Sequence, residues 1–420
     1  MTAPPLGRDY RLLWSAAVSS RLGDALRTPA LALLAATLTR DPRVIAAVTV
    51  AGQLPPLLFG LLGGVYADRW DRRRTMAVVD GLRAAVTGAL ALAIALDRAG
   101  VAALVAVAFL LAALGTLFDA ASFAMLPSVV PPAALPRANG RLQAGSAVAG
   151  GFLGAPAAGV LFALAAPLPF TVDALTFLCA ALLALALRPV PPSPRAQPGR
   201  RSVWREGVEG MRWVRGDALL WRLTVATAGS NLAISGLMAV LVLYALDVLR
   251  VPPAGYGLFA AGAVLGGLAG GLGAGRLAAR LGTVPAFRVV LAGQAVALTG
   301  LALARHPVPG GLALAVFAAG TTVWNGLWAS YGQRHVPPAL LGRVGAAQRM
   351  VGLLTAPVGA ALAGMAGAAY GVGPVAAAVA GVFVLVTLAA WRTLRPAAPA
   401  PAAGPTSAAT AARPGRRPSR

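Results

Sequence analysis

A carboxylate flanked by two arginines lies inside an apolar stretch near the start of the chain. Arg21, Asp24 and Arg27 are spaced three residues apart, so they share one face of a helix. Charges in such a helix are costly to insert into a membrane and usually face a partner or a polar cavity. A proton carrier must change its charge, whereas two guanidinium groups stabilise the ionised form. We therefore expect Asp24 to lose one arginine contact and bind a proton in one conformation; the alternative is that this cluster only fixes the first helix.

Two further acids lie in apolar stretches, and each has its own interpretation. Asp119 has either a coupling or substrate role or an interhelical hydrogen bond, and Asp173 is expected to cap the start of its helix. The sequence has no paired carboxylates, no His/Cys cluster and no nucleophile with its base. We therefore expect no enzymatic activity, cofactor or metal. Because the chain contains no lysine, an ATP-binding loop that needs lysine is excluded.

Composition shows which elements must position these groups. Apolar residues make up 58% of the 420 residues and charged residues 12%, with a mean hydropathy of +0.74. This balance excludes a water-soluble globule and predicts an all-α membrane protein of twelve transmembrane helices, each about 20 to 25 residues long. The expected spans are 12–39, 43–67, 75–96, 101–125, 138–165, 168–188, 218–246, 254–279, 286–304, 309–332, 344–370 and 374–394.

Arginine placement predicts the orientation of these spans. Loops on one side, together with the central segment, contain Arg69, Arg72, Arg73, Arg74, Arg137, Arg141, Arg195, Arg200, Arg201, Arg205, Arg212, Arg215, Arg276, Arg280, Arg334 and Arg343. Loops on the other side contain Arg40, Arg43, Arg98, Arg250 and Arg305. Because basic loops stay in the cytoplasm, we expect a multi-pass protein of the cell membrane with both termini cytoplasmic. Topology thus accounts for the net charge of +23 without a nucleic-acid partner.

Two polar segments divide and end the chain. Residues 189–217 form a cytoplasmic linker whose first part is rich in proline, and residues 202–216 have the period of an amphipathic helix suited to the lipid headgroups. A solvated connector is the alternative for that helix. Residues 395–420 are expected to be a disordered basic tail. The linker separates an N-terminal bundle, 1–188, from a C-terminal bundle, 218–394, and we expect a monomer.

The two bundles repeat one another at an offset near 207 residues. Residues 12–14 and 219–221 both read Leu-Leu-Trp, and 130–137 matches 336–343 at six of eight positions. Parallel repeats of this kind build a substrate cavity between the halves. Asn231 and Asn325 occupy the positions that correspond to the two acids Asp24 and Asp119. Any coupling by carboxylates is therefore expected in the first half.

The loop after the second span contains a specific signature. Residues 64–74, which include Gly64 and Arg69, read Gly-Val-Tyr-Ala-Asp-Arg-Trp-Asp-Arg-Arg-Arg. This resembles the G-x-x-A-D-R-x-x-R-R motif of the major facilitator superfamily, with Asp71 replacing the usual glycine. Patterns at 11–14, 68–73, 130–139 and 173–177 resemble its enterobactin-exporter-like and macrolide-efflux branch of drug:proton antiporters. The resemblance implies two pseudo-symmetric six-helix bundles that transport by alternating access.

Span five contains Gly151, Ala155, Pro156 and Gly159, a pattern similar to the Gly-Pro motif of exporters in this superfamily. Ala155 stands where that motif has the glycine of its Gly-Pro pair, and Val160 where it has the last glycine. Small residues four apart let helices approach closely, and a proline bends the span. The motif favours export over import, although such small-residue patterns are common in membrane helices.

We expect the loop signature to act as a latch on the cytoplasmic side. Asp68 would accept hydrogen bonds from the start of span eleven and from Arg343, while Arg72 and Arg73 would bind carboxylates or helix C-termini. Generic positive-inside charge explains the arginines but not the acid among them.

The cavity candidates are aromatic and polar residues of the inner spans. They are Gln53, Asn231, Tyr244, Gln294, Trp324, Asn325, Trp328 and Tyr331. The two tryptophans and Tyr331 form one stripe, which suits either a flat amphiphilic, even cationic, substrate or plain helix packing. We expect the partners to be a small amphiphilic compound (a drug, antibiotic or siderophore), protons and the lipid bilayer. Import of a metabolite and lipid flipping on the same scaffold are the alternatives.

Overall fold

The computed structural model describes residues 6–69, 71–131, 134–189, 203–337 and 340–393, and within these ranges every regular element is helical. Side chains of 60–69 lie outside the description. Eleven segments are long and apolar enough to cross a membrane. The first helix is equally long but contains the charged group around Asp24. The prediction of an all-α membrane protein is confirmed.

The helices follow the predicted spans closely. The first half contains α1 (Arg8–Leu38), α2 (Pro42–Arg69), α3 (Arg72–Ala95), α4 (Val101–Val129), α5 (Leu135–Ala147), the π-helix η2 (Val148–Gly154), α6 (Ala155–Leu164) and α7 (Leu168–Leu185). The second half contains α8 (Val203–Gly216), α9 (Ala218–Leu243), the π-helix η3 (Tyr244–Val248), the 3-10 helix η4 (Pro253–Gly255), α10 (Tyr256–Leu281), α11 (Thr283–Leu303), α12 (Pro307–His335), α13 (Leu341–Tyr370) and α14 (Val372–Thr393).

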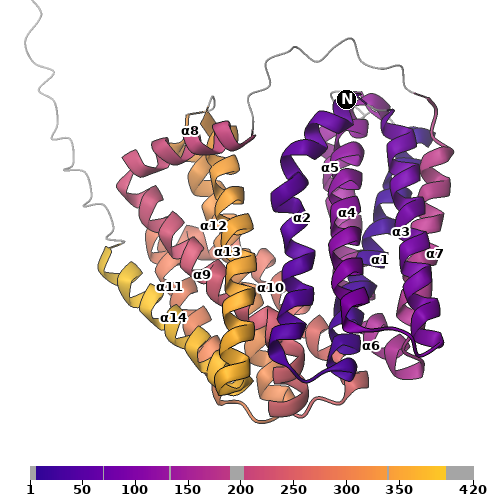
Figure 1. Ribbon diagram of the computed structural model, residues 1–420. Helices are drawn as coiled ribbons and strands as arrows, with labels where there is room; N and C mark the ends of the chain where they lie inside the picture. The colour runs from indigo at the N-terminus through magenta and orange to yellow at the C-terminus, as the bar shows by residue number, and fades with distance from the viewer. Residues whose placement is uncertain (1–5, 70, 132–133, 190–202, 338–339, 394–420) are drawn as a thin grey trace, which may run out of the picture.

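These helices form two bundles side by side (Figure 1). In the first, α7 packs on α3 and α1, and α2 packs on α4; in the second, α10 packs on α12, α9 on α13, and α11 on α14. Small residues bring the backbones together. A Cβ atom on Gly236 of α9 would lie 2.9 Å from the Gly359 carbonyl oxygen of α13. Close backbone approach thus replaces bulky interdigitation where the two helices cross.

The bundles meet at one end and diverge toward the other (Figure 1). We call the face where α1 begins and α14 ends the terminal face, and the opposite face the distal face. At the distal face Arg40 pairs with Asp247 across the bundles at 2.9 Å. Gly364 of α13 packs against Ala46 of α2 there, since a Cβ on the glycine would overlap that side chain. The molecule is therefore closed at its distal face.

The span-five segment forms a further contact between the bundles at the distal face. Pro156 lacks the N–H that a continuous helix needs, and the chain passes through the π-helix η2 directly before it. Beyond the proline, Gly159 of α6 lies against Gly257 of α10, where an added Cβ would be 2.7 Å from the Gly257 nitrogen. The two bundles thus touch through backbone atoms at this point.

Helix α8 lies across the terminal end of the second bundle (Figure 1). Its Val214 is fully buried in the core beneath, and its Gly210 packs against the backbone of α13 at Arg343. Val208 remains exposed. The amphipathic pattern of the segment is therefore used, at least in part, to dock on α9 and α13.

The glycine contact at the distal face gives a test of closure. Gly257→Ala places a Cβ 2.8 Å from the Gly159 nitrogen, which forces the α6–α10 contact apart at a cost of about 1–3 kcal/mol for overpacking. We expect the distal face to open, measured as a longer spin-label distance across it in a Cys179→Ser background. Gly262→Ala on the same helix, where the nearest atom would lie at 3.9 Å, is the control. Equal distances in both variants would contradict the closure described here.

Candidate functional site

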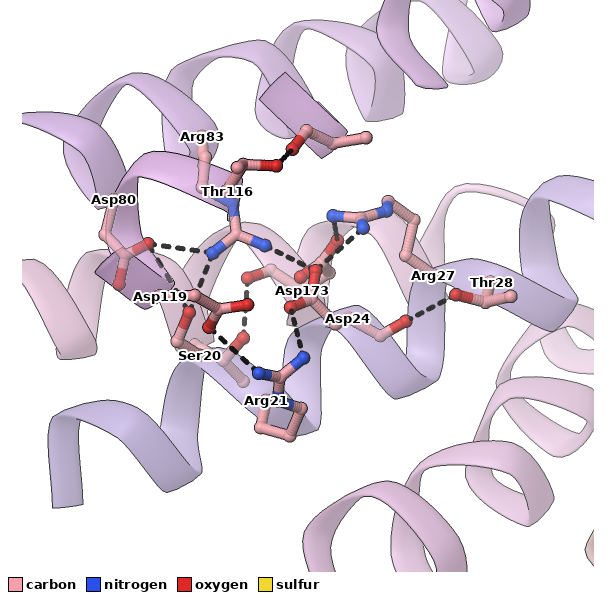
Figure 2. Close-up of polar contacts among 12 residues, drawn as sticks. Ser20, Arg21, Asp24, Arg27, Thr28, Asp80, Arg83, Thr116, Asp119 and Asp173 are labelled. Atoms are coloured by element: carbon pink, nitrogen blue, oxygen red, sulfur yellow. Dashed lines mark hydrogen bonds and ion pairs between the residues drawn. The ribbon is translucent and has the colours of Figure 1, made fainter. Parts of the chain in front are cut away.

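The flanked carboxylate of α1 is the centre of a charge network in the first bundle (Figure 2). Asp24 accepts a hydrogen bond from Arg27 at 2.7 Å and lies 4.0 Å from Arg21. It also pairs with Arg83 of α3. Its side chain is 23% exposed, so this central carboxylate is partly accessible.

Sequence reasoning missed Arg83, although its guanidinium group joins α1 to α3. The side chain is 1% exposed and contacts Asp80 at 3.0 Å and the hydroxyl of Ser20 at 2.8 Å. Its guanidinium carbon lies 3.8 Å from the centre of the Phe177 ring, close enough for a cation–π contact. The three-residue spacing of Asp80 and Arg83 within the third apolar stretch was the available signal.

The network reaches α4 through its more exposed members. Arg21 donates to Asp119 at 2.9 Å, and the two side chains are 45% and 57% exposed. With Asp24, Ser20 and Ser122 they line a small pocket of about 140 Å³. The two acids singled out from the sequence therefore open into one space.

Asp173 corrects the expectation of a helix cap. Helix α7 begins at Leu168 without a side-chain cap, and Asp173 lies farther along, where its side chain is fully buried. Neither of its oxygens has a hydrogen-bond partner among the described residues. Its nearest cation is Arg27, at 3.9 Å. The carboxyl group faces the network because α1 and α7 pack together.

A larger cavity of about 590 Å³ lies in the second bundle. Its walls come from α9, α11, α12, α13 and α14. The predicted cavity residues that line it are Asn231, Gln294, Trp324, Asn325 and Trp328. It extends to Val336 and Val344, which lie near the terminal ends of α12 and α13. The cavity is thus aromatic and amide-lined, and it lies on the side where the bundles diverge.

Three predicted cavity residues lie elsewhere. Tyr244 is fully buried and donates its hydroxyl to the Leu301 carbonyl at 2.6 Å. Tyr331 is buried against His335, with ring centres 4.0 Å apart. Gln53 belongs to α2 of the other bundle. The placement of the two tyrosines could not be predicted, because a helical stripe gives the period of a face but not the neighbour that covers it.

Arg349 is a cavity residue that sequence reasoning missed. It lies on α13, is exposed, and has no ion-pair or hydrogen-bond partner among the described residues. No acidic side chain lines the described wall of this cavity. The cavity therefore presents an uncompensated positive charge.

The loop signature is described only in part. Side chains of Gly64, Asp68 and Arg69 lie outside the described residues. Arg72 donates to the Ala124 carbonyl at 3.1 Å and Arg73 to the Leu185 carbonyl at 3.1 Å, near the C-terminal ends of α4 and α7. Of the two kinds of partner expected for these arginines, carboxylates and helix C-termini, the structure shows helix C-termini. Positive charge is stabilised there by the exposed carbonyl groups.

Arg343 has a different partner from the one expected. It forms an ion pair with Glu209 of α8 at 3.4 Å, so in this conformation it links α13 to the docked linker helix. In the described ranges no three His, Cys, Asp or Glu side chains are grouped to hold a metal ion.

Comparison with family models gives a match to the Major Facilitator Superfamily over residues 13–360. The chain belongs to this superfamily. It is therefore a multi-pass membrane transporter and not an enzyme. No curated protein matches the chain.

Solved structures similar to this superfamily member show the same fold. A bacterial homologue of the iron transporter ferroportin in its inward-facing state has 16% identity and a TM-score of 0.74, covering 93% of this chain and 100% of that one. The nucleoside transporter NupG has 14% identity and a TM-score of 0.71, covering 93% and 100%. The outward-facing state of the ferroportin homologue, at 16% identity, covers 92% and 99% with a TM-score of 0.57.

Loss of the buried cation should destabilise this superfamily member strongly. Arg83→Gln leaves buried Asp80 without its cation, and breaking a buried pair in this way costs about 3–5 kcal/mol. We expect a lower midpoint of thermal unfolding in detergent, partly recovered by adding Asp80→Asn. Arg40→Gln, which breaks the exposed pair with Asp247, should cost less than about 1 kcal/mol. Equal midpoints for the Arg83 and Arg40 variants would contradict a structural role for the network.

Proposed function

We propose that the protein exports a small amphiphilic compound in exchange for protons. The observation that carries this proposal is the charge network of the first bundle, which opens through Asp24 and Asp119 into a small pocket. Proton exchange needs a carboxyl group that changes partners when the bundles move, and a path by which water reaches the network from one side. The second bundle has asparagines at both corresponding positions, and these line the larger cavity. This difference between the bundles fits proton coupling in the first bundle and substrate binding in the second.

Alternating access requires that the contacts at the distal face and the latch at the terminal face do not form at the same time. We place the halves at 1–188 and 218–394, joined by the 189–217 linker, with the terminal face in the cytoplasm because the arginine-rich loops lie there. The distal closure through Gly159 and Gly257 then defines the inward-facing state. In the other state we expect Arg343 to leave Glu209 and join Asp68 in the latch. The similarity of the loop and span-five motifs to drug exporters supports the export direction.

The cavity supports an amphiphilic substrate without positive charge. Trp324, Trp328, Phe317 and Phe383 supply flat apolar surface, and the amides supply hydrogen bonds. Arg349, whose charge no described neighbour neutralises, repels cations and attracts carboxylates. Neutral and anionic aromatic compounds are therefore the class that this cavity favours.

Transport in vesicles tests coupling and direction. Purified protein is reconstituted in liposomes, and a proton gradient of either polarity is imposed on a fluorescent aromatic carboxylate. We expect uphill movement opposite to the proton flow, abolished by an uncoupler and by Asp24→Asn. Cotransport in the same direction would indicate import, and movement of a labelled phospholipid alone would indicate lipid flipping. An Asp24→Asn protein that still accumulates substrate under the gradient would refute the coupling role.

Tryptophan fluorescence tests the charge preference of the cavity. Because Trp324 and Trp328 line it, a bound aromatic ligand should quench their emission. We expect an aromatic carboxylate to bind at least tenfold more tightly than its amine analogue, a difference of about 1.4 kcal/mol. Arg349→Gln should remove this preference and leave the affinity for the neutral amide analogue unchanged, while Arg349→Lys should keep it. Equal affinities for the amine and the carboxylate in the native protein would overturn the assignment.

A further inference from the structure

The charge network contains one acid more than it has arginines. Its carboxyl groups belong to Asp24, Asp80, Asp119 and Asp173, and its guanidinium groups to Arg21, Arg27 and Arg83. An unbalanced charge within a membrane bundle is costly. The simplest way to remove the excess is for one carboxyl group to bind a proton.

Contacts within the network indicate which carboxyl group this is. Asp24 accepts from Arg27 and Arg83, Asp80 accepts from Arg83 and Ser20, and the exposed Asp119 accepts from Arg21. Asp173, like Asp80, has no exposed surface. It differs from Asp80 because neither of its oxygens accepts a hydrogen bond from a described residue, whereas Asp80 lacks a partner on one oxygen only. An ionised carboxylate in such a place loses its hydration and gains no hydrogen bond in return, only the attraction of Arg27 at 3.9 Å.

The helices around Asp173 offer a single cation for it. Helix α1 contributes Arg27 and, behind it, Asp24. Helix α3 contributes Asp80 and Arg83. The guanidinium group of Arg83 is already bonded to Asp24 and Asp80. Helix α6 has no charged residue. On α7 itself, the Thr176 hydroxyl donates its hydrogen bond to the backbone carbonyl of Asp173 at 2.7 Å, and therefore not to the carboxyl group.

Arg27 is placed between two acids but is bonded to only one of them. One terminal nitrogen donates to Asp24 at 2.7 Å. The other is buried, has no hydrogen-bond partner among the described residues, and lies 3.9 Å from Asp173 (Figure 2). Gly23, on the same helix, lies against the Asp173 carboxyl group so closely that an added Cβ would overlap it. A movement of α1 that shortens this 3.9 Å separation would turn the second ion pair into a hydrogen-bonded one.

We propose that Asp173 holds the exchangeable proton and that Arg27 replaces it when α1 moves. In the conformation described here, Asp173 is the neutral acid and Arg27 is bonded to Asp24. When the O–H bond of Asp173 breaks, its electron pair stays on the carboxylate and the proton leaves to water in the pocket beside Asp24. Arg27 then turns to the new carboxylate, so Asp173 stays neutralised. The one net negative charge that this leaves falls on Asp24, whose side chain is 23% exposed and lines the pocket. The link to transport rests on the proposed proton coupling, whereas the protonation itself does not.

Comparison with the corresponding positions of the second bundle supports a functional reason for the charges of Asp80, Arg83 and Asp173. At the offset of 207 residues, Phe287 and Val290 occupy the positions of Asp80 and Arg83. At the offset of 206 that aligns 130–137 with 336–343, Val379 occupies the position of Asp173. All three are buried in the apolar core of the second bundle. The same scaffold therefore packs with apolar residues at these points in the second bundle, so the fold itself does not require charged residues there.

Infrared difference spectroscopy of the purified protein tests the proposal directly. A protonated carboxyl group without hydrogen bonds absorbs at the upper end of the carboxyl C=O range, apart from solvent-exposed acids. We expect the native protein to show such a band at acidic pH and to lose it as the pH rises. Asp173→Asn should lack the band, and Asp119→Asn, in which the exposed acid is changed, should keep it. A native protein without the band, or a band that persists in Asp173→Asn, would overturn the proposal.

Arg27→Gln keeps the experiment informative if Asp173→Asn does not fold. It leaves Asp173 in place but removes the cation that replaces the proton, so the band should persist at the pH at which the native protein loses it. A band that disappears at the same pH in both proteins would also overturn the proposal. Asp80→Asn separates the two buried acids, because loss of the band there at acidic pH would assign the proton to Asp80.

Transport distinguishes this proposal from the proposed function. In liposomes, Asp173→Asn should exchange substrate across the membrane without any response to an imposed proton gradient. If native transport itself ignores the gradient while the infrared band is present, proton coupling fails and the buried protonated acid stands. If the gradient drives native and Asp173→Asn transport equally, the assignment of the carrier to Asp173 fails and proton coupling stands.

Discussion

The contact between Arg83 and the two acids Asp24 and Asp80 is the constraint on which the first bundle depends. A guanidinium group that is 1% exposed must be neutralised where it lies, and this requires α1 and α3 to be held at a fixed separation. Helix α7 then covers the group with the Phe177 ring and brings Asp173 with it. The position of every other charge in the network follows from this arrangement.

The second bundle packs the corresponding positions with uncharged residues. Apolar side chains replace Asp80 and Arg83, and neutral amides replace Asp24 and Asp119. Space that the first bundle fills with a dense ionic network is here a cavity of about 590 Å³. The two bundles thus share one architecture but differ in their side chains: the first contains a charge network, and the second contains a polar and aromatic cavity. Such a division needs a mechanical link, which the glycine contacts and the Arg40–Asp247 pair supply at the distal face.

The helical architecture could be predicted from the sequence almost in full. Membrane spans are long apolar segments whose backbone hydrogen bonds are local, so their number, approximate limits and repeat can be read without knowledge of tertiary contacts. The same holds for the amphipathic α8 and for the loop signature that resembles the superfamily. The three-residue spacing around Asp24 likewise identified the centre of the network, because neighbours on one helical face are fixed by the helix itself.

Contacts between helices were decided only by the tertiary structure. Arg83 and Asp173 come from α3 and α7, and their spacing in the chain carries no information about a shared partner on α1. Tyr244 and Tyr331 had the right residue type for a cavity but the wrong neighbours, since a helical period defines a face without saying what covers it. Arg343 pairs with Glu209 of the docked linker helix because that partner lies beside it in this conformation. Local sequence determined which segments are helices and which residues share a face; the packing of those faces decided which charges meet.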